Sequence, residues 1–192
     1  MAAQFPVALI WAEAQDLHGR WGAIGFKNQL PFSIPEDLEY FSKLTSNQVV
    51  IMGSKTWESL PNKPLPNRQN IVMSRHNSPL SKNHPPGVII TRQPKNAIIA
   101  AQNSLRRNKF PAKIWIIGGE SIYEQFLNFA DEAYITKVMT QVRADSYAPT
   151  LDNYWILNSI EKIQRSQSGL WFRYEHWVSL RPREESNLRP TD

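Results

Sequence analysis

One acidic residue, Asp37, lies in a pattern that could do chemistry. Ile34, Leu38 and Phe41 form an apolar stripe at helical spacing, and Asp37 follows Ile34 by three residues and precedes Phe41 by four. This spacing places a carboxylate against the buried face of a helix, where desolvation raises its affinity for a proton and suits it to a cationic or amidine-like ligand. The alternative is that Asp37 only complements the helix dipole, as acids in a first turn do.

Three segments that follow apolar runs could bind the phosphates of a nucleotide. Residues 117–123 contain the pair Gly118 and Gly119, residues 52–56 contain Gly53, and residues 74–76 read Ser-Arg-His. Glycine lets backbone approach a pyrophosphate, and hydroxyls and cations at strand ends are where nucleotide phosphates bind. A glycine pair between a strand and a helix can also be a simple tight turn, but three such ends in one chain favour a nucleotide site.

Short apolar runs and helical patterns alternate along the chain and would position these segments. The runs at 7–12, 49–53, 71–74, 88–91, 114–118 and 133–138 predict strands, most of them buried on both faces. Helical patterns lie at 35–45, 55–60, 96–107 and 120–129. This order predicts an α/β fold, a three-layer sandwich with helices on both faces of a mostly parallel sheet. Residues 155–163 and 171–180, separated by the turn signal Ser168-Gly169, predict a C-terminal antiparallel hairpin.

Length and composition exclude several classes of protein. The 192 residues, with 41% hydrophobic and 20% charged, indicate one globular domain, expected at 1–180 and followed by a disordered polar tail at 181–192. The chain has no cysteine, which excludes disulfides, thiolate metal sites and a cysteine nucleophile and favours the cytoplasm. The first apolar run spans six residues, too few for a signal peptide or a membrane span.

The charge is moderately positive. The formal net charge is +5 and the isoelectric point is near 9.5, which could indicate a nucleic-acid-binding module. The basic residues are spread along the chain, and no run of four occurs. A diffuse field of this kind suits a small polyanionic ligand at least as well as a duplex.

Taken together, these segments resemble dihydrofolate reductase of the bacterial type. The matching stretches follow in order and spacing from residue 7 to residue 180: IWA at 10–12, AIG at 23–25, NQLPF at 28–32, PEDL at 35–38 with Phe41, MG at 52–53, TWESL at 56–60, PLPNRQN at 64–70, IGG at 117–119 with Tyr123, and IT at 135–136. The resemblance implies an eight-stranded sheet. It also implies hydride transfer from NADPH to C6 of dihydrofolate, with a proton reaching N5 to give tetrahydrofolate.

The resemblance also implies a substrate pocket. Asp37 would hold the 2-amino and N3 edge of the pterin and promote N5 protonation through ordered water, and Thr136 would brace its carboxylate. Arg68 would pair with the α-carboxylate of the glutamate portion. Leu30 and Phe32 count among the catalytic residues, although Phe32 stands where tryptophan is usual in bacterial members. The other expected substrate residues are Ile10, Trp11, Ala12, Leu38, Phe41, Leu60, Leu65, Ile117 and Tyr123.

An NADPH site is implied at the strand ends, and no metal is expected. Its residues would be Ala12, Ile24, Gly25, Gly53, Ser54, Lys55, Thr56, Ser59, Met73, Ser74, Arg75, His76, Ile117, Gly118, Gly119, Glu120, Ser121, Ile122 and Tyr123. Ser54 stands where many relatives carry a basic residue, so Lys55, Ser74, Arg75 and His76 would contact the 2′-phosphate. Glu120 would have to point away from the pyrophosphate.

Two alternatives remain at this stage. One is a pyrimidine reductase of flavin biosynthesis, which shares the fold and the cofactor turn. The presence of both Asp37 and Arg68 argues against it. The other is the nucleic-acid-binding module. The expected partners are dihydrofolate and antifolate inhibitors, without nucleic acid or membrane, and the expected state is a monomer.

Residues 13–23 lie between the first predicted strand and Ile24, and we expect them to form a loop longer than that of compact bacterial members. Either this loop is a passive surface elaboration, since loops tolerate extra length cheaply, or it forms part of a mobile lid over the nicotinamide. Trp21 and Arg20 favour the lid, because a large aromatic would be wasteful in solvent and a cation suits an anionic cofactor.

Overall fold

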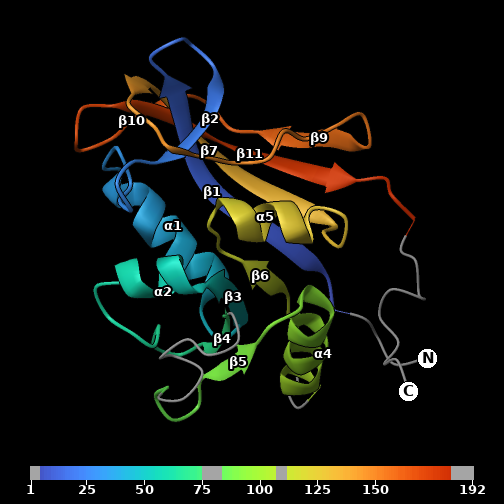
Figure 1. Ribbon diagram of the computed structural model, residues 1–192. Helices are drawn as coiled ribbons and strands as arrows, with labels where there is room; N and C mark the ends of the chain where they lie inside the picture. Colours follow the sequence, from blue (N-terminus) through green and yellow to red (C-terminus); the bar gives the residue numbers. More distant parts are fainter. Residues whose placement is uncertain (1–4, 75–83, 107–111, 183–192) are drawn as a thin grey trace.

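A mixed sheet forms the middle layer of the protein in the computed structural model, which describes residues 5–74, 84–106 and 112–182 (Figure 1). The strands along its main path are β1 (Val7–Asp16), β3 (Val49–Gly53), β4 (Gln69–Met73), β5 (Ile89–Thr91), β6 (Ile114–Ile116), β7 (Glu132–Val142), β10 (Gln164–Arg165) and β11 (Trp171–Ser179). Their order across the sheet is β10-β11-β7-β1-β6-β3-β4-β5. Three further strands pair at the margins: β2 (Trp21–Gly25), β8 (Ser146–Tyr147) and β9 (Trp155–Ile160).

The directions of pairing confirm the predicted topology. From β7 to β5 every neighbouring pair is parallel. β11 runs antiparallel to β7, and both β9 and β10 run antiparallel to β11. The first arm of the C-terminal hairpin is therefore an edge strand that is interrupted between Ile160 and Gln164, and β11 is the continuous second arm.

Helices cover both faces of the sheet, as the alternation of patterns predicts. In the described part of the chain they are α1 (Pro35–Thr45), α2 (Ser54–Ser59), α4 (Pro94–Leu105) and α5 (Glu120–Phe126). One core cluster packs Phe41 of α1 and Trp57 of α2 against the sheet. A second cluster packs Ile98 of α4 and Phe126 of α5 against the opposite face. Figure 1 shows the resulting three layers.

β3 illustrates why the strands read as unbroken apolar runs. All five of its residues are buried. Val50 and Met52 belong to the cluster beneath α1 and α2, whereas Val49 and Ile51 belong to the cluster beneath α4 and α5. Successive side chains of a strand point to opposite faces, so a strand covered on both sides needs apolar residues at every position.

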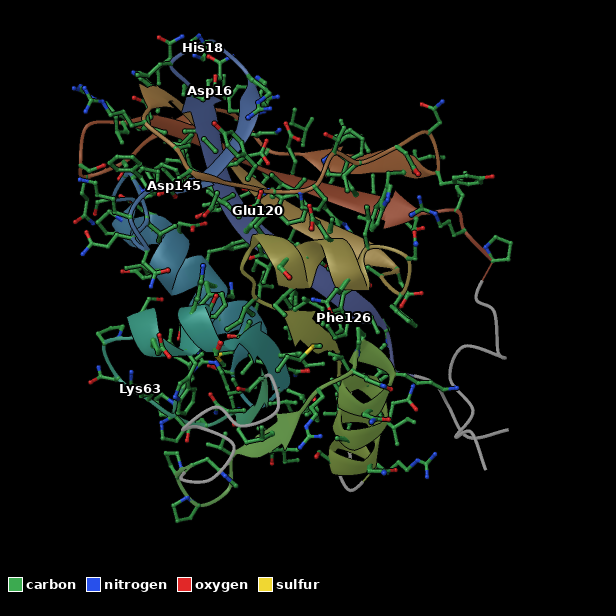
Figure 2. All side chains as sticks on the ribbon, viewed as in Figure 1. Asp16, His18, Lys63, Glu120, Phe126 and Asp145 are labelled. Atoms are coloured by element: carbon green, nitrogen blue, oxygen red, sulfur yellow. The ribbon has the colours of Figure 1, made fainter. Side chains whose placement is uncertain are left out.

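The predicted loop at 13–23 is mostly strand, so this expectation is wrong. β1 continues to Asp16, and β2 begins at Trp21, with Ala14 paired to Ala23. Residues 13, 15 and 16 are polar, so an analysis of apolar runs does not predict that the strand extends this far. Glu13 and Asp16 are nevertheless buried. Only residues 17–20 turn the chain, at the tip where Figure 2 labels His18.

The described residues include no helix that is long and apolar enough to cross a membrane. At the C-terminal end of the described chain, the Arg181 guanidinium pairs with the Asp152 carboxylate and stacks on Tyr154. Most of the tail expected at 181–192 lies outside the described residues.

Phe126 should contribute strongly to stability, because its side chain at the end of α5 is fully buried in the core cluster beneath α4 and α5 (Figure 2). We expect Phe126→Ala to lower the free energy of unfolding by about 3 to 5 kcal/mol, measured by denaturant titration. Trp171→Ala is the control, because Trp171 is 50% exposed and should cost much less. A loss below about 1 kcal/mol for Phe126→Ala would contradict the packing described above.

Candidate active site

Asp37 lies in the first turn of α1, directly over the centre of the sheet. Pro35 occupies the first helical position, where its missing N–H is harmless, and the Asp37 N–H donates to the Ile34 carbonyl at 3.0 Å. The Thr136 hydroxyl of β7 donates to Asp37 Oδ1 at 2.5 Å. Burial raises the pKa of the Asp37 carboxyl above its usual value and outweighs the bond from Thr136, which lowers it. The carboxyl is thus held in place, and it keeps its proton to a higher pH than an exposed aspartate does.

Apolar side chains surround this carboxyl. Ile10 is buried beneath α1, and Phe41, Leu60, Leu65 and Ile117 pack partly exposed on the same cluster. Two further apolar side chains are open to solvent. Leu38 on α1 is 61% exposed, and Leu30, which precedes the helix, is 57% exposed. Exposed apolar surface next to a carboxyl with few polar neighbours is typical of a binding cleft, and we infer one beside the first turn of α1. Phe32 packs against a third cluster, around Ile34 and Phe172.

Arg68 lies against the C-terminal half of α1. Its Nε donates to Thr45 Oγ1 at 2.8 Å, its Nη1 to the Pro66 carbonyl at 2.8 Å, and its Nη2 to Ser42 Oγ at 3.1 Å. The guanidinium carbon lies 5.7 Å from the centre of the Phe41 ring. These contacts orient a planar cation that can bind a carboxylate with two parallel hydrogen bonds.

The glycine-containing strand ends meet on the other side of the cleft. The Gly53 N–H donates to the Gly118 carbonyl at 2.8 Å, which joins the end of β3 to the turn after β6. Gly118 has φ of +102°, and a Cβ there would lie 2.9 Å from the Tyr123 ring. A Cβ on Gly119 would lie 3.6 Å from Thr56 Oγ1 of α2. The Tyr123 ring therefore fills the place of a side chain at Gly118, whereas the Thr56 hydroxyl is the nearest group to Gly119. Exposed glycine backbone beside a hydroxyl is what the predicted pyrophosphate site would need.

The family comparison agrees with this geometry. The chain matches the model of the family described as dihydrofolate reductase over residues 6–178. The chain belongs to the dihydrofolate reductase family. The match favours neither a pyrimidine reductase nor a nucleic-acid-binding module.

Several curated dihydrofolate reductases are similar over most of their length. The enzyme of Buchnera aphidicola subsp. Acyrthosiphon pisum is 38% identical over 151 residues, which cover 78% of this chain and 83% of that protein. The Mycobacterium leprae enzyme is 33% identical over 87% of this chain and 94% of its own. Dihydrofolate reductase type 9 of Escherichia coli is 32% identical over 85% and 90%.

Among the substrate residues expected of this dihydrofolate reductase family member, Trp11 directs its side chain to the face of the sheet opposite Ile10. Its indole packs on Tyr123, with ring centroids 5.3 Å apart, and its Nε1 donates to Glu13 Oε2 at 2.5 Å. It belongs to the cluster beneath α5, whereas Ile10 faces α1. Only the backbone of Trp11 can therefore border the cleft of Asp37.

Most of the expected cofactor residues lie at the ends of β2, β3, β4 and β6 or in the helices α2 and α5. Tyr123 of α5 is tied to β1, because its hydroxyl donates to the Ile10 carbonyl at 2.7 Å. Arg75 and His76 lie outside the described residues. The rest are Ala12 in β1, Ile24 and Gly25 in β2, Gly53 in β3, Met73 and Ser74 at the end of β4, Ser54, Lys55, Thr56 and Ser59 in α2, Ile117, Gly118 and Gly119 after β6, and Glu120, Ser121, Ile122 and Tyr123 in α5.

Sequence reasoning missed the contacts that hold the chain between β2 and α1. Asp145 accepts a hydrogen bond from the Lys27 N–H at 2.9 Å, and its own N–H donates to the Gly25 carbonyl at 2.9 Å. Figure 2 shows Asp145 between the β1–β2 hairpin and the start of α1. These residues are more than 100 positions apart in the chain, so no local pattern could have paired them.

Trp21 also has a partner that the sequence did not indicate. The Lys137 ammonium lies 4.7 Å from the centre of the Trp21 ring and forms an ion pair with buried Glu13. At the tip of the same hairpin, the Arg20 guanidinium stacks 4.0 Å from the centre of the Tyr147 ring. The hairpin is thus fastened to β7 and β8 by cation–π contacts.

The raised pKa of Asp37 makes a prediction about stability. An acid whose pKa is higher in the folded state destabilises the fold when it is ionised, because the unfolded chain accommodates the charge better. Asp37→Asn keeps an oxygen for Thr136 and removes the charge. We expect the variant to unfold at a higher temperature than the wild type at pH 7, with the difference growing as pH rises above about 3.9, the pKa of an unfolded aspartate.

Thermal melts across pH 3 to 8 measure this difference. Glu39→Gln serves as the control, since Glu39 is exposed on the same helix and should give a difference that changes little with pH. A gain for Asp37→Asn that is the same at pH 3 and pH 7 would show that the Asp37 charge is not the cause.

Proposed function

We propose that this chain reduces 7,8-dihydrofolate to 5,6,7,8-tetrahydrofolate, with NADPH as the hydride donor. The observation that supports this most strongly is the Asp37 carboxyl, which lies in an apolar cleft, braced by Thr136 and with a raised pKa. Family membership supports the reaction class. The pairing of this carboxyl with a pterin and the use of NADPH are the parts that experiment must test.

Asp37 binds and orients the substrate. The 2-amino group and N3–H of a pterin are neighbouring donors, and they match the two oxygens of one carboxylate. Thr136 holds Oδ1, so the carboxylate plane is set before the substrate binds. Antifolate inhibitors with an amidine-like ring edge would pair with the same oxygens.

Proton delivery to N5 also depends on Asp37. A carboxylate paired with the pterin edge favours the protonated form of the ring, and ordered water carries the proton to N5. The apolar side chains of Ile10, Phe41 and Leu60 exclude bulk water from the ring, which strengthens the charge interactions within the cleft.

The glycine-containing strand ends fit NADPH. When bound, NADPH supplies the hydride that C6 of the pterin accepts. Ile122 and Tyr123 of α5 fill the places that side chains at Gly53 and Gly118 would take, so the glycines let the strand ends pack closely on this helix. The Gly119 backbone, with Thr56 beside it, would approach the pyrophosphate. Lys55 in α2 and Ser74 after β4 lie at neighbouring strand ends, where they would contact the 2′-phosphate. Arg75 and His76, which would complete that contact, lie outside the described residues.

Arg68 binds the glutamate portion of the substrate. Its bonds to Thr45, Pro66 and Ser42 orient the guanidinium beside Phe41, at the end of the cleft away from Asp37. Leu30, Leu38 and Leu65 line the path between the two ends. The proposal also includes a monomer, and a cytoplasmic location that the absence of cysteine supports.

The direct test is an assay of NADPH oxidation with and without dihydrofolate, repeated with NADH. We expect oxidation that requires dihydrofolate and prefers NADPH. Retention on DNA at physiological salt without such oxidation would instead support the nucleic-acid-binding module.

Asp37→Asn should slow turnover severely at pH 7 while leaving NADPH binding intact, because a neutral amide cannot favour the protonated pterin. Loss of an acid–base group costs roughly 10²- to 10⁴-fold in rate. Steady-state rates and NADPH titration by fluorescence measure the two effects, with Glu39→Gln as control. A variant that keeps more than about a tenth of the wild-type rate would overturn the role of Asp37.

Arg68→Leu should raise KM for dihydrofolate far more than it lowers kcat, because the glutamate carboxylate lies far from the reacting carbons. Hydrogen bonds to charged groups contribute about 1.5 to 3 kcal/mol, so KM should rise roughly 10- to 150-fold. Arg165→Leu is the matched control, because Arg165 is an exposed arginine in β10. An unchanged KM for Arg68→Leu would remove Arg68 from the binding site.

A further inference from the structure

Glu36, the residue before Asp37, makes contacts that the reaction as described does not use. Its side chain reaches the turn between β10 and β11. There Glu36 Oε2 accepts a hydrogen bond from the Ser166 hydroxyl at 2.6 Å, and Oε1 accepts one from the Gln167 N–H at 2.8 Å. The Glu36 carbonyl accepts a third bond, from the Tyr174 hydroxyl of β11 at 3.2 Å. Three bonds thus join one residue of α1 to a segment about 130 positions away.

The turn that receives Glu36 is itself well ordered by hydrogen bonds. The Ser166 N–H donates to the Leu170 carbonyl at 2.8 Å, and the Gly169 N–H donates to the Ser166 carbonyl at 2.8 Å. The Ser166 side chain is buried, and its Oγ also accepts from the Ser168 N–H at 3.2 Å. The carboxylate of Glu36 therefore binds a fixed pair of donors and not a loose surface loop.

The contacts of Glu36 and Asp37 lie side by side in the sheet. Thr136, which holds the Asp37 carboxyl, is paired directly with Tyr174, which holds the Glu36 backbone. Local sequence does little to anchor the start of α1, because Ile34 has no side-chain polar group to cap the helix and Pro35 has no N–H. Besides the packing of buried Ile34, the contacts of Glu36 are therefore the polar contacts next to Asp37 that fasten this turn to β11 and the turn before it.

We propose that Glu36 is a positioning residue for dihydrofolate reduction, whose carboxylate fastens the first turn of α1 to the β10–β11 turn and so keeps the Asp37 carboxyl at the depth where it pairs with the pterin. This inference rests on the proposed function of Asp37. Glu36 acts through geometry. Its charge is directed at Ser166 and Gln167, away from the cleft.

Three substitutions separate geometry from charge. Glu36→Ala removes both side-chain bonds and the charge. Glu36→Gln removes the charge but keeps the clamp, because its amide oxygen accepts from Gln167 and the Ser166 hydroxyl can turn to pair with the amide. Ser166→Ala removes the bond to Glu36 Oε2 and leaves the charge, and it also removes the two bonds that Ser166 Oγ accepts from Ser168. Glu39→Ala, on the exposed face of the same helix, is the matched control for loss of an acid.

The measurements are kcat and KM for dihydrofolate and the pH profile of kcat/KM, on variants whose folding is checked by circular dichroism. We expect Glu36→Ala to lower kcat/KM at pH 7 roughly tenfold, Ser166→Ala to lower it several-fold, and Glu36→Gln to stay within about twofold of the wild type. The apparent pKa of the profile should fall in Glu36→Ala and Ser166→Ala, because a loosened first turn lets water reach Asp37.

Several results would overturn the proposal. One is equal impairment of Glu36→Gln and Glu36→Ala with a normal Ser166→Ala, which would assign the effect to charge. Another is a lower melting temperature in Glu36→Ala with an unchanged pH profile and kcat/KM, which would leave only a structural role. Asp37→Asn is measured in the same series: if it is impaired and Glu36→Ala is not, the positioning role alone fails, whereas a fully active Asp37→Asn ends both proposals.

Discussion

A carboxyl group in an apolar cleft costs free energy unless fixed partners satisfy it, and Asp37 depends on such partners. Thr136 donates to one of its oxygens from the middle of β7, so the contact joins the first turn of α1 to the centre of the sheet. The other oxygen of the carboxyl remains available to a ligand. Burial raises the pKa of this carboxyl above its usual value. Much of the surrounding architecture serves to place these two side chains within hydrogen-bond distance of each other.

The two faces of the sheet contribute differently to the site around Asp37. On one face, α1 and α2 cover an apolar cluster but leave Leu38 and Leu30 open, which produces a cleft instead of a closed core. On the other face, Tyr123 of α5 packs against Trp11 of β1, and the Tyr123 hydroxyl donates a hydrogen bond to the backbone of β1. The rigid face holds β1 in position while the open face receives the substrate in the reaction that we propose.

Contacts between distant segments hold the rim of the site. Asp145 binds the backbone at Gly25 and Lys27, Lys137 lies over Trp21, and Glu36 binds the β10–β11 turn. Most of these contacts use charged groups, which accept or donate strong hydrogen bonds without filling the cleft. The contacts of Asp145 and Lys137 hold the short segment around Gly25 in place, although this segment has no hydrophobic core of its own.

The local pattern of apolar residues determined the α/β class, the bounds of α1 and β3 and the placement of Asp37 on the inner face of its helix, because period and burial are properties of neighbouring residues. The resemblance led to Thr136 and Arg68, which periodicity alone would not have found. Only the tertiary structure decided that residues 13–16 and 21–23 are strands, that the Trp11 indole faces α5, and that Glu36 and Asp145 bind distant backbone. Strand pairing and ion contacts join residues far apart in the chain, and their polar side chains resemble those of any exposed loop until the partner strand buries them.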